Sequence, residues 1–265
     1  MKEINSRQNS RVKELVKLQS KKYRRQKQQF LLEGFNLIES ALKAGAKIEE
    51  VYIDKNQEIE DELDRIKELV GEGVVFINLA SELMTEVSTT VTPQGIVAVA
   101  RRNTSSLEKI LSLEGPLLML AKIQDPGNAG TLIRSASAAG VKGIVALKGT
   151  VELFNPKVIR SSMGGIFKPR VCPDLESEEF IKTVLDVAEE RRMVITSPDA
   201  ENNYFDISLG DEDIFVVGNE SRGIPGKLRS INHIPVSIPL PGDLNSLNAG
   251  VAGSIVMFDW VRQNY

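Results

Sequence analysis

The 265-residue sequence contains one cysteine, Cys172, and one histidine, His233. A single cysteine excludes an intramolecular disulfide and any metal site built from several cysteines. It also fits a reducing compartment, so we expect a cytoplasmic protein. A zinc site would need mostly carboxylate ligands, so we expect no metal. A Ser-His-Asp triad would have to use His233, and no G-x-S-x-G segment accompanies it. We therefore interpret both residues as structural.

Long apolar runs are also missing. None approaches the ~20 residues needed to span a bilayer, so no membrane partner is expected. The first residues, MKEINSRQNSRVK, contain no apolar stretch of the kind found in secretory signals. The hydrophobic content of 42% is nevertheless ordinary for a globular protein, and the length is sufficient for one large domain or two small ones.

Two common phosphate-binding motifs are absent as well. No G-x-G-x-x-G follows the first predicted strand of either half, which disfavours a dinucleotide site. Residues 218–223 have the G-x-x-x-x-G spacing, but Ile224 and Pro225 follow where a P-loop needs Lys and Ser or Thr. The sequence therefore disfavours hydrolysis of ATP or GTP and an enzyme acting on a phosphorylated metabolite.

Positive charge is concentrated at one end of the chain. The net charge is −3, yet residues 1–30 hold ten Lys and Arg against two acidic residues, which gives +8 there and leaves −11 for the rest. A basic arm on an acidic body can indicate a polyanionic partner, and a solvated lysine-rich helix explains it equally well. If the partner is RNA, the candidate phosphate contacts are Lys17, Lys21, Lys22, Arg24 and Arg25.

Hydrophobic patterns predict a small α/β domain over residues 1–102, followed by a linker at 103–115. The basic segment 9–29 carries a short apolar stripe and is expected to be one helix. The other elements expected in this domain are helices ending near Ala44 and spanning 57–70 and 82–87, and strands at 48–53, 74–77 and 95–100.

A second domain is predicted over residues 116–265, where buried-looking strands again alternate with helices. This alternation implies a mostly parallel sheet covered on both faces. Strands are expected at 117–123, 143–147, 170–172, 193–196, 214–218 and 234–239, and helices at 130–139, 155–165, 177–191, 225–231 and 246–262.

Polar residues follow three of these strands, at the sheet edge where ligands usually bind. In the first segment, DPGNAGTLIR (125–134), Asn128 lies where a helix begins, and an inward-facing Arg134 would offer a fork for a phosphate or carboxylate. Taken alone, this segment is better explained as an ordinary helix start with a surface arginine. In the second, GNESRG (218–223), Glu220 could accept hydrogen bonds from ribose hydroxyls or an amine, or be an exposed loop acid.

The third segment, IPLPGDLNSLN (238–248), leads into the last predicted helix. Ser246 is interpreted first as the N-cap of that helix. Asn248 would then fall in the first turn, where asparagine is unfavourable without a special partner. Three such segments at one sheet edge indicate a site more strongly than any one of them.

Four stretches resemble, in order and spacing, the motifs of SpoU-type RNA methyltransferases, also called TrmH-like, of the SPOUT class: DPGNAGTLIRSASAAG (125–140), IRSSMGGIFKPRV (159–171), GNESRGI (218–224) and IPLPGDLNSLNAGVAG (238–253). The resemblance spans about residues 116–265. The N-terminal third is similar to the substrate-binding domain of many members, through Ile4, Ser6, Asn9, Lys13, Leu18 and FLLEG (30–34).

The resemblance implies methylation of a ribose 2′-hydroxyl in RNA, with S-adenosylmethionine as methyl donor. It further implies a trefoil knot, a rare exception to normal chain topology, and a homodimer. By motif match the catalytic set is Asn128, Arg134, Glu220, Ser246 and Asn248, and the cofactor contacts are Thr196, Gly218, Ile238, Leu240 and Leu247. Two departures concern packing more than chemistry: Gly165 replaces the usual Ala, and Ala249-Gly250 replaces Val-Ser.

Within this interpretation we expect Arg134 to bind phosphate and stabilise charge on the 2′-oxygen, because guanidinium groups stay protonated at neutral pH and are poor bases. Asn128 and Ser246 would hold Arg134 and the ribose, and Glu220 would orient Arg134. The separate N-terminal domain favours ribosomal over transfer RNA, by family analogy. The alternative from another class is a non-catalytic RNA-binding or ribosome-assembly factor, which the complete polar set disfavours.

Overall fold

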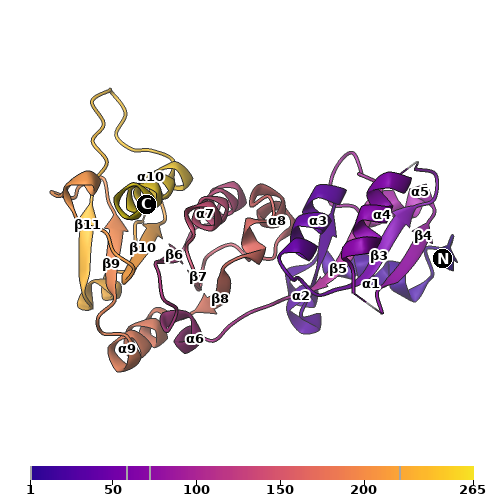
Figure 1. The fold of residues 1–265 in the computed structure, drawn as a ribbon, viewed down its shortest axis with the longest axis horizontal. Helices are drawn as coiled ribbons and strands as arrows, with labels where there is room; N and C mark the ends of the chain where they lie inside the picture. The colour runs from indigo at the N-terminus through magenta and orange to yellow at the C-terminus, as the bar shows by residue number, and fades with distance from the viewer. Residues whose placement is uncertain (1, 58, 72, 221) are drawn as a thin grey trace. The chain divides into compact units, whose positions relative to one another are not determined.

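The computed structural model describes residues 2–57, 59–71, 73–220 and 222–265. The chain forms two compact units (Figure 1). The first consists of Met1–Asn103 together with Phe154–Arg160, and the second of Thr104–Leu153 together with Ser161–Tyr265. A short segment from the second half of the sequence therefore belongs to the first unit.

The first unit is built on a five-stranded mixed sheet with the order β1-β4-β3-β5-β2. β5 pairs antiparallel with β2 and β3, and the other pairs are parallel. The strands are β1 (Lys2–Ile4), β2 (Gln29–Glu33), β3 (Ile48–Asp54), β4 (Val75–Leu79) and β5 (Ile96–Arg101). The sequence patterns did not predict β1 and β2: β1 has only three residues, and β2 is buried along most of its length, so it shows no alternation.

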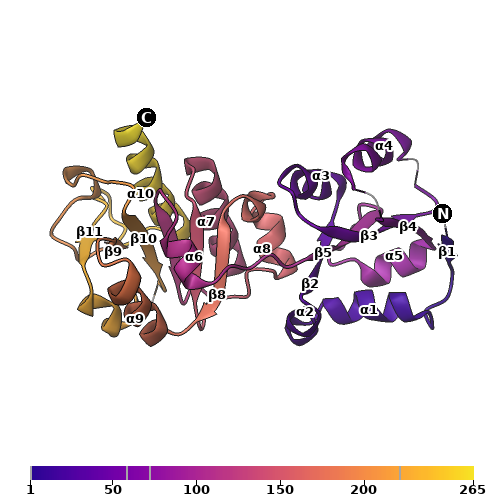
Figure 2. The ribbon, with the colours of Figure 1, turned by 60° about the horizontal axis from the view of Figure 1, so that its bottom comes forward.

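Five helices cover this sheet: α1 (Ser10–Leu18), α2 (Lys21–Lys27), α3 (Phe35–Lys43), α4 (Glu60–Leu69) and α5 (Ser81–Val87). In Figure 2, α1 and α5 lie on one face of the sheet and α3 and α4 on the other. The expectation of one helix over 9–29 is wrong, because Ser20 begins a second helix and its hydroxyl accepts a hydrogen bond from the Tyr23 amide. Glu58, inside the helix expected at 57–70, lies outside the described residues.

The second unit is built on a six-stranded sheet with the order β11-β9-β10-β6-β7-β8. Every described pairing in it is parallel, which confirms the expected parallel α/β domain. The strands are β6 (Leu117–Ala121), β7 (Gly143–Leu147), β8 (Arg170–Leu175), β9 (Arg192–Thr196), β10 (Asp213–Gly218) and β11 (His233–Val236).

Helices lie on both faces of this sheet, with α7 against α10 and α6 against α9 (Figure 1). Those of the second unit are α6 (Leu107–Leu111), α7 (Pro126–Ala139), α9 (Ser177–Val187) and α10 (Ala249–Asn264), whereas α8 (Pro156–Ser161) lies almost entirely in the segment that belongs to the first unit. Helix α6 lies in the stretch expected to be a linker, and its apolar side chains are buried in the core of the second unit. The expected helix 225–231 is a 3₁₀ helix, Gly226–Ser230. No helix within the described ranges is both long and apolar enough to cross a membrane.

Candidate active site

The three polar segments meet because of the strand order. β6 and β10 are parallel neighbours, and Ala121 at the end of β6 pairs with Gly218 at the end of β10. The chain continues from β6 into the start of α7 and from β10 into the loop that carries Glu220. The start of α10 lies beside them, because α10 packs against both α7 and β10. This is the sheet edge that the sequence predicted for a ligand.

Helix α7 begins with two residues suited to a helix start. The carboxylate of Asp125 is the N-cap and accepts a hydrogen bond from the Asn128 amide at 2.7 Å. Pro126 follows at the first helical position, where its missing N–H costs nothing. These two residues fix Asn128 in the first turn, with its side chain toward the loop after β10.

Helix α10 is capped by Asn248 and not by Ser246, so the expected cap is wrong. The Asn248 Oδ1 accepts hydrogen bonds from the amides of Gly250 at 2.9 Å and Val251 at 3.3 Å. Because the oxygen of the carboxamide is used for the cap, its nitrogen is turned toward α7. Asn248 therefore has two kinds of partner that explain an asparagine here. Its oxygen binds the first amides of α10, and its nitrogen faces Asn128 on α7.

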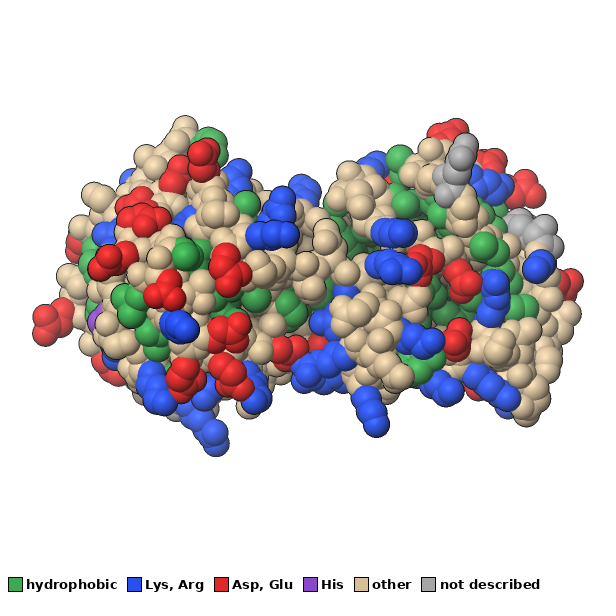
Figure 3. Space-filling model, turned by 90° about the horizontal axis from the view of Figure 1, so that it is seen from below, with side chains coloured by type: hydrophobic (Ala, Val, Ile, Leu, Met, Phe, Trp, Pro, Cys, Tyr) green, Lys and Arg blue, Asp and Glu red, His purple; other side chains and the backbone are tan. Residues whose placement is uncertain are grey.

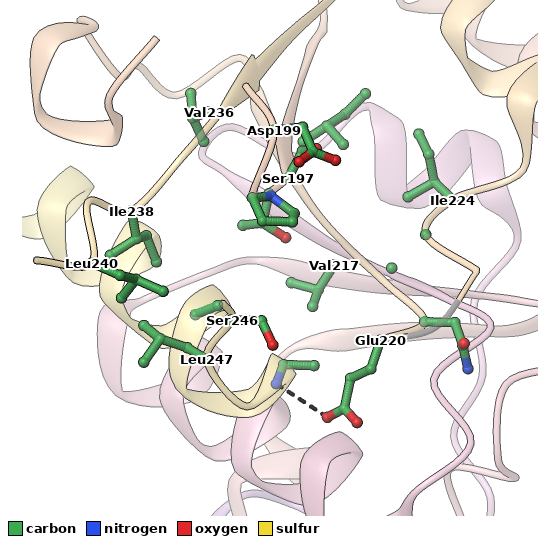
Figure 4. Close-up of a pocket in the computed structure, with 18 of the residues that line it drawn as sticks. Ser197, Asp199, Val217, Glu220, Ile224, Val236, Ile238, Leu240, Ser246 and Leu247 are labelled. Carbon is green, nitrogen blue, oxygen red and sulfur yellow. Dashed lines mark hydrogen bonds between the residues drawn. The ribbon is translucent and has the colours of Figure 1, made fainter. Parts of the chain in front are cut away.

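A chain of hydrogen bonds then joins the three segments. The Asn248 Nδ2 donates to the Asn128 Oδ1 at 2.7 Å, and the Asn128 Nδ2 donates to the Glu220 Oε1 at 2.8 Å. The same Glu220 oxygen accepts from the Ala249 amide at 3.3 Å, drawn as the dashed line in Figure 4. The carboxylate is thus placed at the N-terminus of α10, where the helix dipole favours negative charge.

Close approach of backbones makes this arrangement possible. A Cβ at Gly253 would lie 2.5 Å from the Leu132 Cδ2 and 2.6 Å from the Val217 Cγ2, so the side chains of α7 and β10 fill the space beside this glycine of α10. A Cβ at Gly218 would lie 2.7 Å from the carbonyl carbon of Gly223. The loop that carries Glu220 can therefore fold back on the end of β10 only because residue 218 has no side chain.

Arg134 is placed differently from expectation. Its side chain is exposed, because the buried face of α7 is formed by residues such as Leu132, Ile133 and Ala136. Within the described part of the chain it makes no hydrogen bond or ion pair, so the expected links from Asn128, Ser246 and Glu220 to Arg134 are not present. Arg134 is thus an exposed cation on the helix that carries Asn128.

A cavity of about 370 Å³ opens beside this network. Its walls are about equally polar and apolar, and Glu220 and Ser246 lie at one end (Figure 4). All five predicted cofactor contacts line it: Thr196, Gly218, Ile238, Leu240 and Leu247. The apolar side chains in the wall suit a flat heterocycle, and the carboxylate can accept hydrogen bonds from hydroxyl or amino groups.

Sequence reasoning missed several residues of the cavity wall, among them Ser197, Asp199, Ile224, Arg229 and Val236. Ser197 and Asp199 lie just beyond the end of β9, so their position after a strand of a parallel sheet was a usable signal. Arg229 lies in the 3₁₀ helix Gly226–Ser230, and Val236 ends the edge strand β11. Neither carries a motif that would have pointed to the cavity.

The basic arm of the first unit is split between exposed and buried side chains. Lys17, Lys21, Lys22 and Arg25 are exposed, and Figure 3 shows Lys and Arg side chains spread over the face on which α1 and α2 lie. Arg24 is only 2% exposed, and its Nη1 donates to the carbonyls of Leu18 at 2.9 Å and Gln19 at 2.7 Å. Arg24 therefore satisfies the end of α1, and its prediction as an RNA contact is wrong.

The lone histidine and cysteine take no part in the site. His233 lies in β11 with its Nδ1 at 2.9 Å from the Ile231 carbonyl. Cys172 is buried in β8, where burial, and secondarily the carboxylates of Glu179 and Glu108, raise the pKa of its thiol to about 11. Within the described ranges no group of three or more His, Cys, Asp or Glu side chains is placed to hold a metal ion.

Two protein families match this chain, one in each part of the sequence. Residues 115–258 match the SpoU rRNA Methylase family, and residues 9–98 match the MRM3-like substrate binding domain. The chain is 32% identical over 261 residues to the 23S rRNA (guanosine(2553)-2′-O)-methyltransferase RlmP of Bacillus subtilis, covering 97% of this chain and 98% of that protein.

Solved structures agree with the sequence match. An AdoMet-bound rRNA methyltransferase from Sinorhizobium meliloti is similar with a TM-score of 0.88 and 27% identity, covering 100% of this chain and 98% of that one. The SpoU methyltransferase AviRb from Streptomyces viridochromogenes, in complex with AdoMet, is similar with a TM-score of 0.86 and 25% identity, covering 97% and 98%. The similarity therefore extends over both units.

Proposed function

The chain belongs to the SpoU rRNA methylase family and is an RNA ribose 2′-O-methyltransferase that uses S-adenosylmethionine, and we propose that it methylates one ribose of 23S rRNA. The resemblance to SpoU-type enzymes is confirmed, and the names of the family and of its relatives support the expectation of a ribosomal substrate. The 23S assignment is supported by the full-length similarity to RlmP, which is named for that RNA. A second relative, from Streptomyces viridochromogenes, is named for a uridine instead of a guanosine. We therefore assign 23S rRNA and the ribose 2′-hydroxyl to this chain, but not the base of the nucleotide.

The observation that carries this proposal is the junction of the cavity with the amide–carboxylate network. The cofactor fits the cavity by its chemistry: apolar side chains of Ile238, Leu240 and Leu247 would hold the adenine, and Glu220 would accept hydrogen bonds at the polar end. When bound, S-adenosylmethionine supplies a sulfonium methyl group that is already electrophilic. The task of the protein is therefore to place a ribose hydroxyl in line with that methyl group.

We assign the binding of the ribose and its phosphate to Arg134. Its guanidinium is exposed and has no partner within the described part of the chain, so it can donate a pair of parallel hydrogen bonds to a phosphate. Phosphate binding there fixes the nucleotide, and the cationic charge stabilises the 2′-oxygen as its proton passes to solvent water. Alignment of two reactants can contribute ~7–11 kcal/mol of barrier lowering, so positioning alone can carry much of the catalysis.

Asn128, Glu220 and Asn248 act together in this proposal. In Asn128 and in Asn248 the amide oxygen accepts from one partner and the amide nitrogen donates to another. These hydrogen bonds fix the orientation of both amides and of the Glu220 carboxylate. A fixed Glu220 carboxylate orients the hydroxyl or amino groups that reach it from the cavity. Ser246 lines the same cavity and would contact the ribose.

The first unit would bind RNA outside the reacting nucleotide. Lys17, Lys21, Lys22 and Arg25 supply an exposed basic surface, and Tyr23 lies between two of its cations, with the Nζ atoms of Lys17 and Lys27 at 5.7 Å and 5.6 Å from its ring centre. Such a surface binds phosphates without reading sequence. Selection of the modified ribose then belongs to the second unit.

Three further features of the family complete the proposal. A trefoil knot is supported by the path of the chain, which leaves the edge strand β11 and returns to pack α10 on α7 and β10. A homodimer is supported by Val251 and Phe258, which leave apolar side chains 46% and 47% exposed on α10. Action in the cytoplasm is supported by the single, reduced cysteine.

The function is tested by methyl transfer from labelled S-adenosylmethionine to total RNA from a strain that lacks this protein. The RNA is separated by size and the 2′-O-methyl sites are mapped. Label at one ribose of 23S rRNA supports the proposal. Label in transfer RNA would retain the chemistry and refute the substrate, and no label in either free RNA or ribosomal particles, with the cofactor bound, would refute both.

A further inference from the structure

A tight turn in the second unit carries an exposed methionine in a strained conformation. Residues 162–165 form this turn, in which the Gly165 amide donates to the Ser162 carbonyl at 2.8 Å. The two central residues, Met163 and Gly164, have φ values of 48° and 82°, and a type I′ turn has positive φ at the same two positions. Such a turn favours Asn-Gly or Gly-Gly, because most side chains are strained at positive φ. The local backbone therefore disfavours the methionine that the sequence places there.

The packing of the fold does not explain this methionine either. Ser162, Gly164 and Ile166 are buried around it, whereas Met163 is 60% exposed. An exposed side chain adds little to the stability of a fold, because it removes little apolar surface from water. A residue that is strained and also exposed is a candidate for a function, since strain of this kind persists at sites where the side chain is used.

The turn lies against the backbone of Arg134, within the same unit. A Cβ at Gly165 would lie 3.0 Å from the Arg134 Cα and 3.3 Å from the Ile133 carbonyl oxygen. One turn earlier on α7, a Cβ at Gly130 would lie 3.0 Å from the carbonyl carbon of Ser161. Residues 161–165 therefore pack along α7. Met163 is exposed two residues from the point where this segment contacts Arg134, whose own side chain is exposed.

We propose, on the basis of the assigned methyltransferase function, that Met163 contacts the base of the nucleotide that is methylated. Arg134 would bind the phosphate of that nucleotide, and a single ribose separates a base from its phosphate. An apolar side chain beside Arg134 is therefore placed to meet the base. The unbranched thioether of methionine packs favourably on aromatic rings and adapts to their shape, so it suits a purine and a pyrimidine alike. This contact orients the nucleotide without selecting its base.

The test compares two RNA substrates and three forms of the full-length protein. The substrates are a 23S rRNA fragment that supports methylation of the mapped ribose, and the same fragment without the base at that nucleotide. Met163→Asn removes the apolar side chain and creates the Asn-Gly pair that the turn favours. Met163→Leu keeps an apolar side chain and serves as the matched control.

The expected effect is specific to the base. Met163→Asn should lower kcat/KM on the intact fragment by about twofold to tenfold, the size of one contact between a sulfur atom and an aromatic ring. Met163→Leu should retain most of the activity. On the abasic fragment the wild-type protein and Met163→Asn should be equal, because no base is left for the side chain to contact.

Stability gives a second measurement, which should change in the opposite direction. Met163→Asn should raise the melting temperature by about 1–4 °C, because asparagine tolerates positive φ and the strain of the turn is relieved. Met163→Leu keeps the strain, so its melting temperature should match that of the wild type. The Kd for S-adenosylmethionine, measured by calorimetry, should be unchanged in both variants. A variant that is more stable and less active is the result expected when a strained side chain serves the reaction.

Four outcomes contradict the inference. Wild-type kcat/KM of Met163→Asn on the intact fragment shows that the side chain is not used, and it refutes this inference alone. An equal loss on both fragments shows that Met163 affects the ribose or Arg134 and not the base. A lowered melting temperature in Met163→Asn makes Met163 a structural residue. A changed oligomeric state in solution makes it a contact between two copies of the chain. If the wild-type protein itself methylates no RNA, the assigned function fails, and the inference with it.

Discussion

Asn248 has two separable tasks, and substitution can remove one while leaving the other. Its oxygen caps α10 by accepting from Gly250 and Val251, and its nitrogen donates to Asn128. Asn248→Asp keeps an oxygen for the cap and replaces the donor by a second acceptor. Asn248→Ala removes both groups. The pair of variants therefore separates the stability of the helix from the order of the site.

The expected sizes follow from these contacts. Loss of an N-cap side chain costs about 1 kcal/mol of the free energy of unfolding, which lowers the melting temperature by about 2–4 °C in a domain of this size. Asn248→Ala should show this loss together with that of the hydrogen bond to Asn128, and Asn248→Asp should lose only the latter, because a carboxylate is also a good cap. Both variants should lose activity by about tenfold or more, since a broken hydrogen bond of a network is typically equivalent to ~1.4 kcal/mol.

Asn128 cannot compensate for Asn248→Asp by turning its amide. A turned amide would donate to the new carboxylate and would then point its own oxygen at Glu220, which is itself an acceptor. The measurement is initial rates of methyl transfer to 23S rRNA beside thermal unfolding of each variant. Full activity in Asn248→Asp would refute the argument that the amide chain orders the site, and an unchanged melting temperature in Asn248→Ala would refute the cap.

Four other outcomes follow from the described contacts. Arg134→Ala should abolish methyl transfer while calorimetry shows unchanged cofactor binding, and substantial turnover would exclude Arg134 from the reaction. Neutralising Lys21, Lys22 and Arg25 should flatten the slope of log K against log salt for RNA by ~2–3, whereas Arg24→Gln should instead lower the melting temperature, because its contacts are internal. Gly218→Ala should weaken cofactor binding by about tenfold or more, since an added Cβ meets the Gly223 backbone, and equal affinity would show that the loop adapts freely. Because burial raises the pKa of Cys172 to about 11, the thiol should react with alkylating reagents at pH 8 only after unfolding, and rapid reaction in the folded protein would contradict its burial.

Much of the second unit could be predicted because its strands are short apolar runs that end at glycine-rich turns. The carboxyl ends of neighbouring parallel strands share an edge, so Asn128 and Glu220 could be expected near each other from the sequence alone. The position of Arg134 was also accessible. Helical spacing from Ile133 to Ala136 and Ala139 marks the buried face, and Arg134 does not lie on it.

Other features depend on contacts that local sequence does not encode. Arg24 and Arg25 are the same residue type at adjacent positions, so the local sequence does not distinguish them. Arg24 is the buried one because its guanidinium donates to the carbonyls at the end of α1. Ser246 and Asn248 are two residues apart, and both residue types are good N-caps. Asn248 is the cap in the structure, where its side-chain nitrogen also donates to Asn128 on α7. The allocation of Phe154–Arg160 to the first unit rests on residues more than 70 positions earlier, such as Thr89 with Arg160 at a separation of 71.

The same long separations govern when the protein becomes an enzyme during its synthesis. The hydrogen bonds of the network join residues 92 and 120 positions apart, so the first cannot form until Glu220 has left the ribosome, and the second must also wait for Asn248 at the start of α10. The sheet of the first unit needs only the first 101 residues. A growing chain therefore folds its basic arm well before it can order Asn128 and Glu220. The unit that matches a substrate binding domain therefore precedes the finished enzyme on every ribosome that makes it.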